Sequence, residues 1–208
     1  MSSPEPSLLA TLTPAIFGLV GVLLGSASAT LKEWWFSRRN DKRDARYLAV
    51  QVVGQLDRYA FACSEVVTDN GLCRGQRDEQ GYRRAQIATP TFNPDLLTVE
   101  WRSIPAELMY AILDLPYKAE VAGHIIESAS ENAEPPDFDD YFEERQLQYA
   151  ALGLEAAAIS TSLRELAELP ERSIAHWDPL AWMNGRKNEI EAIRADRASK
   201  WEIELASR

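Results

Sequence analysis

The chain begins with a long run of uncharged, mostly apolar residues. Residues 8–31 read LLATLTPAIFGLVGVLLGSASATL, which is 24 residues without a charge. At about 1.5 Å per residue, a helix of this length covers the hydrocarbon core of a bilayer, which is about 30 Å thick. The run therefore predicts one transmembrane helix, with residues 1–31 forming an N-terminal tail and the span.

After this run, apolar residues recur at the three- and four-residue spacing of helices. No proline interrupts residues 31–70, and the spacings along one apolar seam alternate between four and three. The seam consists of Ala45, Ala49, Val52, Leu56, Tyr59, Cys63 and Val66. We expect the membrane helix to continue as a cytoplasmic stalk that ends at Asn70-Gly71 and packs against other helices of the same chain.

Three more helices are predicted further along the chain. The first covers about residues 103–129, with a kink at Pro116 and an apolar pattern at helical spacing. This pattern consists of Leu108, Met109, Ile112, Leu113, Ala119, Ala122, Ile125, Ile126 and Ala129. The second begins near residues 137–140, where Asp140 and Glu143 have capping-box spacing, and ends near residue 169. The third begins at Asp178-Pro179 and runs to the C-terminus. The predicted fold is all-α: one N-terminal transmembrane helix continuing into an antiparallel, up-and-down cytoplasmic bundle.

Residues 71–102 break the helical pattern. Glycine and proline punctuate polar sequence there, so we expect a long loop or a small strap. The short apolar runs IATPTF and LLTVEW leave a small hairpin open. A basic cluster stands at its start, for which we favour a solvated loop over contact with phosphate or headgroups: Arg74, Arg77, Arg83 and Arg84.

Charge divides the 208-residue chain into a basic neck and an acidic body. Residues 32–46 hold six basic and three acidic groups, a net charge of +3, whereas residues 47–208 have a net charge of −12. An acidic body repels nucleic acid, so no nucleic-acid partner is expected. The three predicted regions are residues 1–31 (tail and span), 32–46 (juxtamembrane neck) and 47–208 (acidic cytoplasmic helical bundle).

The neck carries the residues expected at the membrane interface and predicts the topology. These residues are Trp34, Trp35, Phe36, Arg38, Arg39, Lys42 and Arg43. Because basic residues follow the span and none precedes it, the positive-inside rule places the N-terminus outside and the C-terminal domain in the cytoplasm. Ala27-Ser28-Ala29 has the form of a signal-peptidase site, which leaves a secreted helical domain as an alternative.

Small residues within the span predict self-association. They recur at spacings of three or four, and Gly21 and Gly25 form a GxxxG that lets a second helix approach closely. The predicted association residues are Ala15, Gly18, Gly21, Gly25 and Ala29. The expected partners are therefore membrane lipid, a second copy bound through the span, and a cytoplasmic protein.

The sequence offers little chemistry. No phosphate-binding, nucleophile-elbow or zinc motif occurs, so no catalytic residue, cofactor or metal is assigned. Glu120, His124 and Glu127 share one helical face and form the only visible nucleus of an atypical carboxylate and histidine metal site. The favoured function is a membrane-anchored interaction or assembly protein, and the alternative is a membrane-tethered enzyme using that site.

Four segments resemble one known family. RYLAVQVVGQLDRYAFAC, TPTFNPDLLTVEWRSIPAELMY, PPDFDDYFEERQLQYAALGL and HWDPLAWM are similar to segments of short proteobacterial proteins that each have one N-terminal membrane helix. The resemblance covers most of the chain after the span. It implies a protein of the bacterial inner membrane and no activity, cofactor or site.

Overall fold

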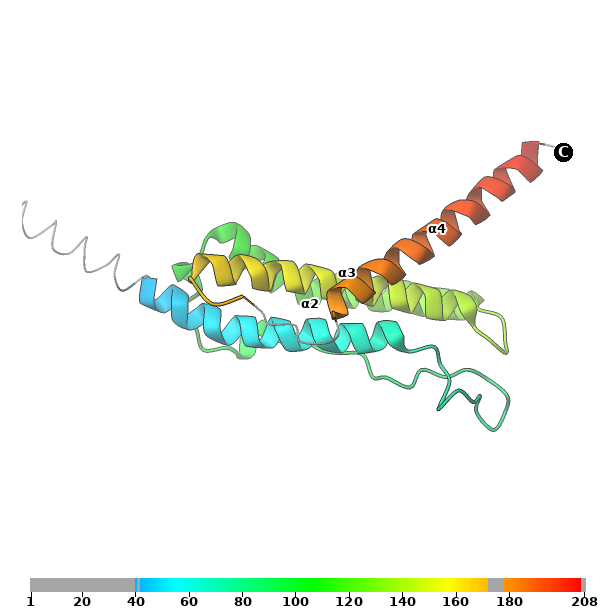
Figure 1. The fold of residues 1–208 in the computed structure, drawn as a ribbon, viewed down its shortest axis with the longest axis horizontal. Helices are drawn as coiled ribbons and strands as arrows, with labels where there is room; N and C mark the ends of the chain where they lie inside the picture. Colours follow the sequence, from blue (N-terminus) through cyan, green and yellow to red (C-terminus); the bar gives the residue numbers. More distant parts are fainter. Residues whose placement is uncertain (1–39, 41, 172–177, 207–208) are drawn as a thin grey trace, which may run out of the picture. The chain divides into compact units, whose positions relative to one another are not determined.

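The computed structural model describes residues 40, 42–171 and 178–206, and in this part of the chain the regular structure is helical (Figure 1). The chain divides into two compact units, Met1–Asp44 and Ala45–Arg208. An N-terminal helix includes residues 42–68. After it come the short 3₁₀ turns η1 (Pro94–Leu96) and η2 (Trp101–Ser103), then α2 (Ala106–Asn132), α3 (Asp139–Leu166) and α4 (Pro179–Ala206). All contacts described below lie within the second unit.

The N-terminal helix buries the seam that its spacing predicts. Val52 and Leu56 are fully buried, and Tyr59 is almost so. The helix ends at residue 68, two residues before the predicted Asn70-Gly71 stop. Gly71 has φ +75°, a left-handed conformation that glycine adopts without a Cβ penalty, and its N–H donates to Asp69 Oδ1 at 2.9 Å.

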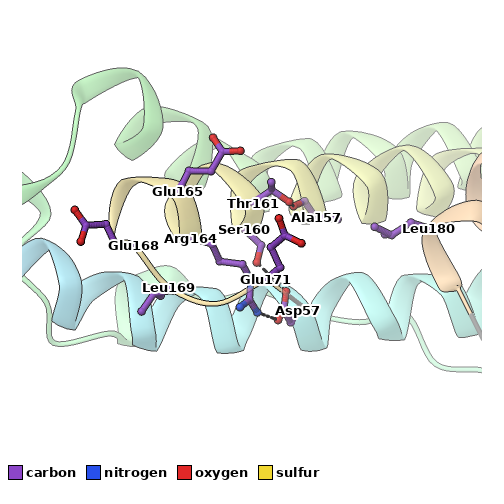
Figure 2. Close-up of a pocket in the computed structure, with 10 residues that line it drawn as sticks. All are labelled: Asp57, Ala157, Ser160, Thr161, Arg164, Glu165, Glu168, Leu169, Glu171 and Leu180. Atoms are coloured by element: carbon purple, nitrogen blue, oxygen red, sulfur yellow. Dashed lines mark hydrogen bonds and ion pairs between the residues drawn. The ribbon is translucent and has the colours of Figure 1, made fainter. Parts of the chain in front are cut away.

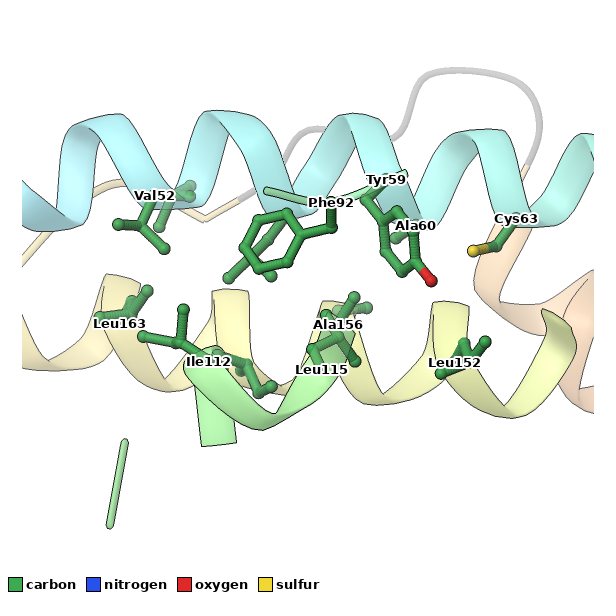
Figure 3. Close-up of a cluster of buried hydrophobic side chains, with 14 of the residues drawn as sticks. Val52, Tyr59, Ala60, Cys63, Phe92, Ile112, Leu115, Leu152, Ala156 and Leu163 are labelled. Atoms are coloured by element: carbon green, nitrogen blue, oxygen red, sulfur yellow. The ribbon is translucent and has the colours of Figure 1, made fainter. Parts of the chain in front are cut away.

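The central helix of the bundle is α3, whose alanine-rich middle lets its neighbours approach closely. Ala150, Ala156 and Leu163 lie in the core with residues of the N-terminal helix and α2, and Figure 3 shows this cluster. At Gly153 the packing is so tight that an added Cβ would lie 2.6 Å from Met183 Sδ and 2.8 Å from Cys63 Cβ. Gly153 is therefore the point where the N-terminal helix, α3 and α4 meet.

The direction of the helices corrects the predicted up-and-down order. Arg164 contacts Asp57, and Arg145 contacts Asp69, so α3 runs opposite to the N-terminal helix. Lys118 contacts Glu155, and in Figure 3 Ile112 and Leu115 follow the same direction as Val52 and Cys63. The N-terminal helix and α2 are therefore parallel. An up-and-down order of helices needs short connections between neighbours. The connection of 37 residues from 69 to 105 is long enough to run back along the bundle, so that α2 starts at the same end as the N-terminal helix.

Residues 69–105, here called the strap, make this return without forming a hairpin. Within the strap, the only β-bridge is the isolated one between Cys73 and Gln76. Pro90 and Pro94 lack the N–H donors that a strand ladder needs. The strap is fixed by its apolar side chains, since Phe92 packs on Tyr59 with ring centroids 5.8 Å apart and Ile104 is buried. Of the structures considered for this segment from the sequence, the observed one is therefore the strap and not the hairpin.

The two helix starts predicted from capping patterns differ in outcome. The α4 start is confirmed, because Asp178 Oδ1 accepts hydrogen bonds from the N–H groups of Leu180 and Ala181 at 2.9 and 3.2 Å. The predicted capping box of α3 is wrong. Its N-cap is Phe138, in a left-handed conformation with φ 53° and without a side-chain cap, and Glu143 instead binds Arg197 of α4.

Two further predictions concern proline and membrane spans. Helix α2 continues through Pro116 as one element of 27 residues. In the ranges that the structure describes, none of the helices has the length and apolarity needed to cross a bilayer. The predicted span at residues 8–31 lies outside those ranges, as do Trp34, Trp35, Phe36, Arg38 and Arg39. Lys42 and Arg43 are described, and both are exposed on the N-terminal helix.

Candidate interaction surface on α2 and α3

Helix α2 carries a second apolar face that the bundle leaves exposed. Its members lie three or four residues apart and form what is here called the outward stripe: Tyr110, Leu113, Tyr117, Val121 and Ile125. The two tyrosines are 67% and 64% exposed. The opposite face of α2 buries Ile112, Leu115, Ala122 and Ile126 in the core. Because that face already supplies the packing of α2, folding of the described chain does not explain the outward stripe.

A groove of about 400 Å³ runs beside the outward stripe between α2 and α3. Its lining combines large side chains from the stripe with two alanines: Tyr117, Lys118, Val121, Ala122, Gln148, Ala151, Leu152 and Glu155. The alanines leave room that longer side chains would fill. The stripe and groove together form a contiguous apolar surface of the kind that proteins use to bind other proteins.

The surroundings of this surface are acidic. Lys118 is held by Glu155 at 2.5 Å and by Asp114 at 3.3 Å, and the hydrogen bond to Glu155 raises its pKa. Lys118 is the only lysine or arginine of α2. The remaining carboxylates of α2 are exposed: Glu107, Glu120, Glu127 and Glu131. The surface is thus apolar along its centre and negative at its edges.

The candidate metal site of the alternative hypothesis faces solvent. Glu120, His124 and Glu127 are exposed at one edge of a shallow groove of about 520 Å³, and the histidine side chain is 81% exposed. His124 Nδ1 lies 3.7 Å from Glu127 Oε2. Among the described residues, no group of three or more histidine, cysteine and carboxylate side chains could hold a metal ion. In the described part of the chain, Glu120, His124 and Glu127 therefore do not form a set of metal ligands.

A second pocket of about 400 Å³ lies where the N-terminal helix meets the end of α3 (Figure 2). Asp57 accepts hydrogen bonds from Ser160 Oγ at 2.7 Å and from Arg164 Nη2 at 2.5 Å. Arg164 also donates to the Pro170 carbonyl at 2.7 Å. These contacts tie the N-terminal helix to α3 and to the chain after it. Since the carboxylate is engaged by an arginine, we assign the group a structural role.

Three consecutive polar residues of α3 form a buried polar cluster with Asp69 that sequence reasoning missed. Arg145 donates to Asp69 Oδ2 at 3.0 Å and to the Ile87 carbonyl, so it binds both ends of one strap segment. Gln146 donates to the Asp69 carbonyl at 2.9 Å, and Glu144 accepts from Arg194 of α4 at 2.7 Å. One turn of α3 therefore binds the strap, including its first residue directly after the N-terminal helix, and also binds α4.

Electrostatics within this cluster favour a charged Asp69. Burial alone would raise the pKa of its carboxyl group. The N–H groups of Ile87, Gly71 and Gln86 and the Arg145 charge outweigh burial and lower the pKa below its usual value. Elsewhere in the core, burial raises the pKa of the Cys63 thiol to about 12, as expected for a small core residue with little thiolate character.

Arg77, Arg83 and Arg84 of the basic cluster form ion pairs with carboxylates of the same chain. Arg77 binds Asp137 at 2.5 Å, Arg83 binds Asp139 at 2.6 Å, and Arg84 binds Asp78. The pairs of Arg77 and Arg83 attach the first part of the strap to the start of α3, and the pair of Arg84 with Asp78 lies within the strap. The favoured prediction, a solvated loop without phosphate contact, is compatible with this pairing.

The outward stripe was partly visible in the sequence. Leu113 and Ile125 entered the predicted core pattern of this helix, but they are 38% and 41% exposed. The signal that could have separated them is the second three- and four-residue series through Tyr110, Tyr117 and Val121. The predicted association residues of the span, Ala15, Gly18, Gly21, Gly25 and Ala29, lie outside the described ranges.

No known protein family, curated protein or solved structure matches the chain. The proteobacterial resemblance of the sequence therefore stays a prediction.

Proposed function

We propose that this protein is a single-pass, inner-membrane-anchored interaction or assembly protein whose cytoplasmic helical bundle binds a protein partner. The observation that carries the proposal is the outward stripe of α2 with its adjoining groove. Five exposed apolar side chains on one face of one helix are costly to leave in water unless they serve a contact. The stripe is also separate from the core face that folds the chain.

The membrane anchor is proposed from the sequence. The 24 uncharged residues are long enough to span a bilayer, and the basic neck that follows favours a cytoplasmic C-terminal part. In this arrangement the span and neck determine where the protein resides, in the bacterial inner membrane. The body then presents the α2 surface to proteins of the cytoplasm.

Topology is tested by fusing reporters after Arg208. A reporter that is active only in the cytoplasm should work at this position, whereas an export-dependent phosphatase should be inactive. The opposite result would contradict the proposed orientation. Mass spectrometry of the membrane fraction should in addition find the intact N-terminus, and cleavage after Ala29 would support the secreted alternative instead.

The interaction role is tested by photo-cross-linking in cells. A photoreactive phenylalanine analogue at Tyr117 should give a discrete cross-linked product, because this side chain stands on the outward stripe. The matched control is the same analogue at Leu96, which is 81% exposed and lies on η1. Equal products from the two positions would show that the stripe is ordinary surface and would contradict the proposal.

A further inference from the structure

We propose that the α2–α3 surface binds a cationic amphipathic helix of a partner protein. The proposal rests on the proposed function and names the class of partner. Its basis is the combination, within one surface, of an apolar stripe, a groove beside it and carboxylates along its edges.

The shape of the surface fits a helix. The outward stripe extends over 16 residues of α2, from Tyr110 to Ile125, which corresponds to about 22 Å or four helical turns. A partner helix of similar length can lie along it with apolar side chains at three- and four-residue spacing, which is the usual mode of helix binding in a groove. Ala122 and Ala151 leave space in the groove for a bulky side chain of that helix.

The carboxylates beside the stripe favour a positively charged partner. Glu120 and Glu127 lie along one side of the stripe, while Asp114 and Glu155 lie on the other side around Lys118. Lys118 is already bound by both of these carboxylates, so it offers little to an anionic partner. Basic side chains that flank the apolar face of a partner helix would meet carboxylates on both sides, which is complementary.

The same charges disfavour two other occupants. A second copy would bring the acidic α2 edges of both molecules together, and residues 47–208 have a net charge of −12 in each copy. A bilayer with anionic lipid would repel the carboxylates that border the stripe. Both occupants are outcomes of the test below.

The experiment uses the full-length protein in nanodiscs of zwitterionic lipid, with empty nanodiscs as background. The probe is a fluorescent 18-residue peptide of leucine and lysine, with leucines at helical three- and four-residue spacing. Comparison peptides are a scrambled sequence of the same composition and a leucine–glutamate peptide of the same pattern. We expect the patterned leucine–lysine peptide to bind at least about tenfold more tightly than either comparison, because only it matches both the stripe and the charges.

Two variants locate the binding. Tyr117→Ser with Val121→Ser should weaken binding about tenfold or more, because both side chains belong to the apolar centre of the surface. Glu120→Lys with Glu127→Lys should weaken binding and reduce its dependence on salt. The matched charge control is Glu65→Lys with Glu165→Lys, an equal change of charge at exposed positions on other helices. This control should leave unchanged the part of the peptide affinity that depends on the stripe. All altered side chains are exposed, and circular dichroism checks that each variant folds as wild type does.

The outcomes separate the possibilities. Equal binding by the leucine–glutamate peptide, or no effect of the Tyr117 and Val121 changes, overturns the proposal. So does stripe-dependent dimerisation in sedimentation, or stripe-dependent binding to vesicles that contain anionic phosphatidylglycerol. If the peptides fail while cross-linking at Tyr117 succeeds, the partner class is wrong and the interaction role stands. Failure of both contradicts the proposed function as well.

Discussion

The absence of a side chain at Gly153 allows the N-terminal helix, α3 and α4 to pack closely. An added Cβ would lie 2.8 Å from Cys63 Cβ, which is close to the backbone of the N-terminal helix and cannot move without it. We therefore expect Gly153→Ala to lower the free energy of unfolding by about 1–3 kcal/mol through overpacking. The measurement is urea unfolding of the full-length protein followed by circular dichroism.

Gly123 of α2 is the matched control, because a Cβ added there meets open space. Gly123→Ala should raise the free energy of unfolding by about 0.5–1 kcal/mol, since alanine loses less backbone freedom in a helix. If both substitutions had the same sign, the close approach at Gly153 would not be a constraint on the fold.

The buried pair of Asp69 and Arg145 has consequences for stability that depend on pH. Both side chains are 2% exposed, and Asp69→Asn would leave the Arg145 charge without its carboxylate. We expect the substitution to cost about 3–5 kcal/mol at pH 7. Asp95→Asn, at an exposed position of η1, should change stability by less than about 0.5 kcal/mol.

The sign of the pH effect follows from the lowered pKa of Asp69 in the folded protein. A carboxyl group whose folded pKa lies below its unfolded value of about 3.9 stabilises the fold above that pH and loses this effect as the pH falls through the folded pKa. The difference in unfolding free energy between wild type and Asp69→Asn should therefore narrow below about pH 4. A constant difference between pH 7 and pH 3 would mean that the charge of Asp69 is not what stabilises the cluster.

At the scale of elements, the strap depends on a few anchoring side chains. Phe92 is 6% exposed and packs on Tyr59, while Leu96, four residues later, is exposed. Phe92→Ala should cost about 3 kcal/mol and speed hydrogen exchange of the Gln86 and Ile87 amides that bind Asp69. Leu96→Ala should do neither, and similar exchange in the two variants would show that the strap is fixed elsewhere.

The sequence predicts the elements well and their arrangement poorly, for a physical reason. Helical periodicity is a local signal, so it identifies the buried seam from Ala49 to Val66. The capping pattern of Asp178-Pro179 is equally local and identifies the start of α4. The direction of α2 carries no such signal, because a connection as long as the strap permits either direction. The contact between Asp69 and Arg145 joins residues 76 positions apart, and nothing in either neighbourhood marks the other as its partner.

The candidate surface was missed for a related reason. Periodicity reports that a helix has apolar faces, and α2 has two of them. Which face is covered depends on where α3 packs, and that is a property of the assembled bundle. Leu113 and Ile125 could therefore be counted as core residues from spacing alone, although they belong to the outward stripe.

At the scale of the whole molecule, the proposed span predicts lateral association. Lipid tails surround a leucine side chain as favourably as a neighbouring helix does, so leucine alone does not drive association. Association therefore needs the close packing that Gly21 and Gly25 permit. Gly21→Ile with Gly25→Ile should keep the span apolar and inserted while it raises the monomer fraction in single-molecule photobleaching. Higher salt should strengthen wild-type association, because it screens repulsion between the acidic bodies.

The control is the wild-type protein at matched expression in the same membrane. Equal monomer fractions for wild type and the double variant would show that these glycines are only ordinary membrane-helix composition.

The central place of α3 also determines when this protein can fold during its synthesis. Residues in and directly after the N-terminal helix precede their partners on α3 by 76 to 107 positions, as the pairs of Asp69 with Arg145 and Asp57 with Arg164 show. At about 5–20 residues per second, a ribosome needs roughly 4–20 s to make that interval. For this time the apolar seam has left the ribosome without its native neighbour. A nascent chain that stops before Asp139, where α3 begins, never acquires that neighbour, so its seam stays accessible to proteases and chaperones.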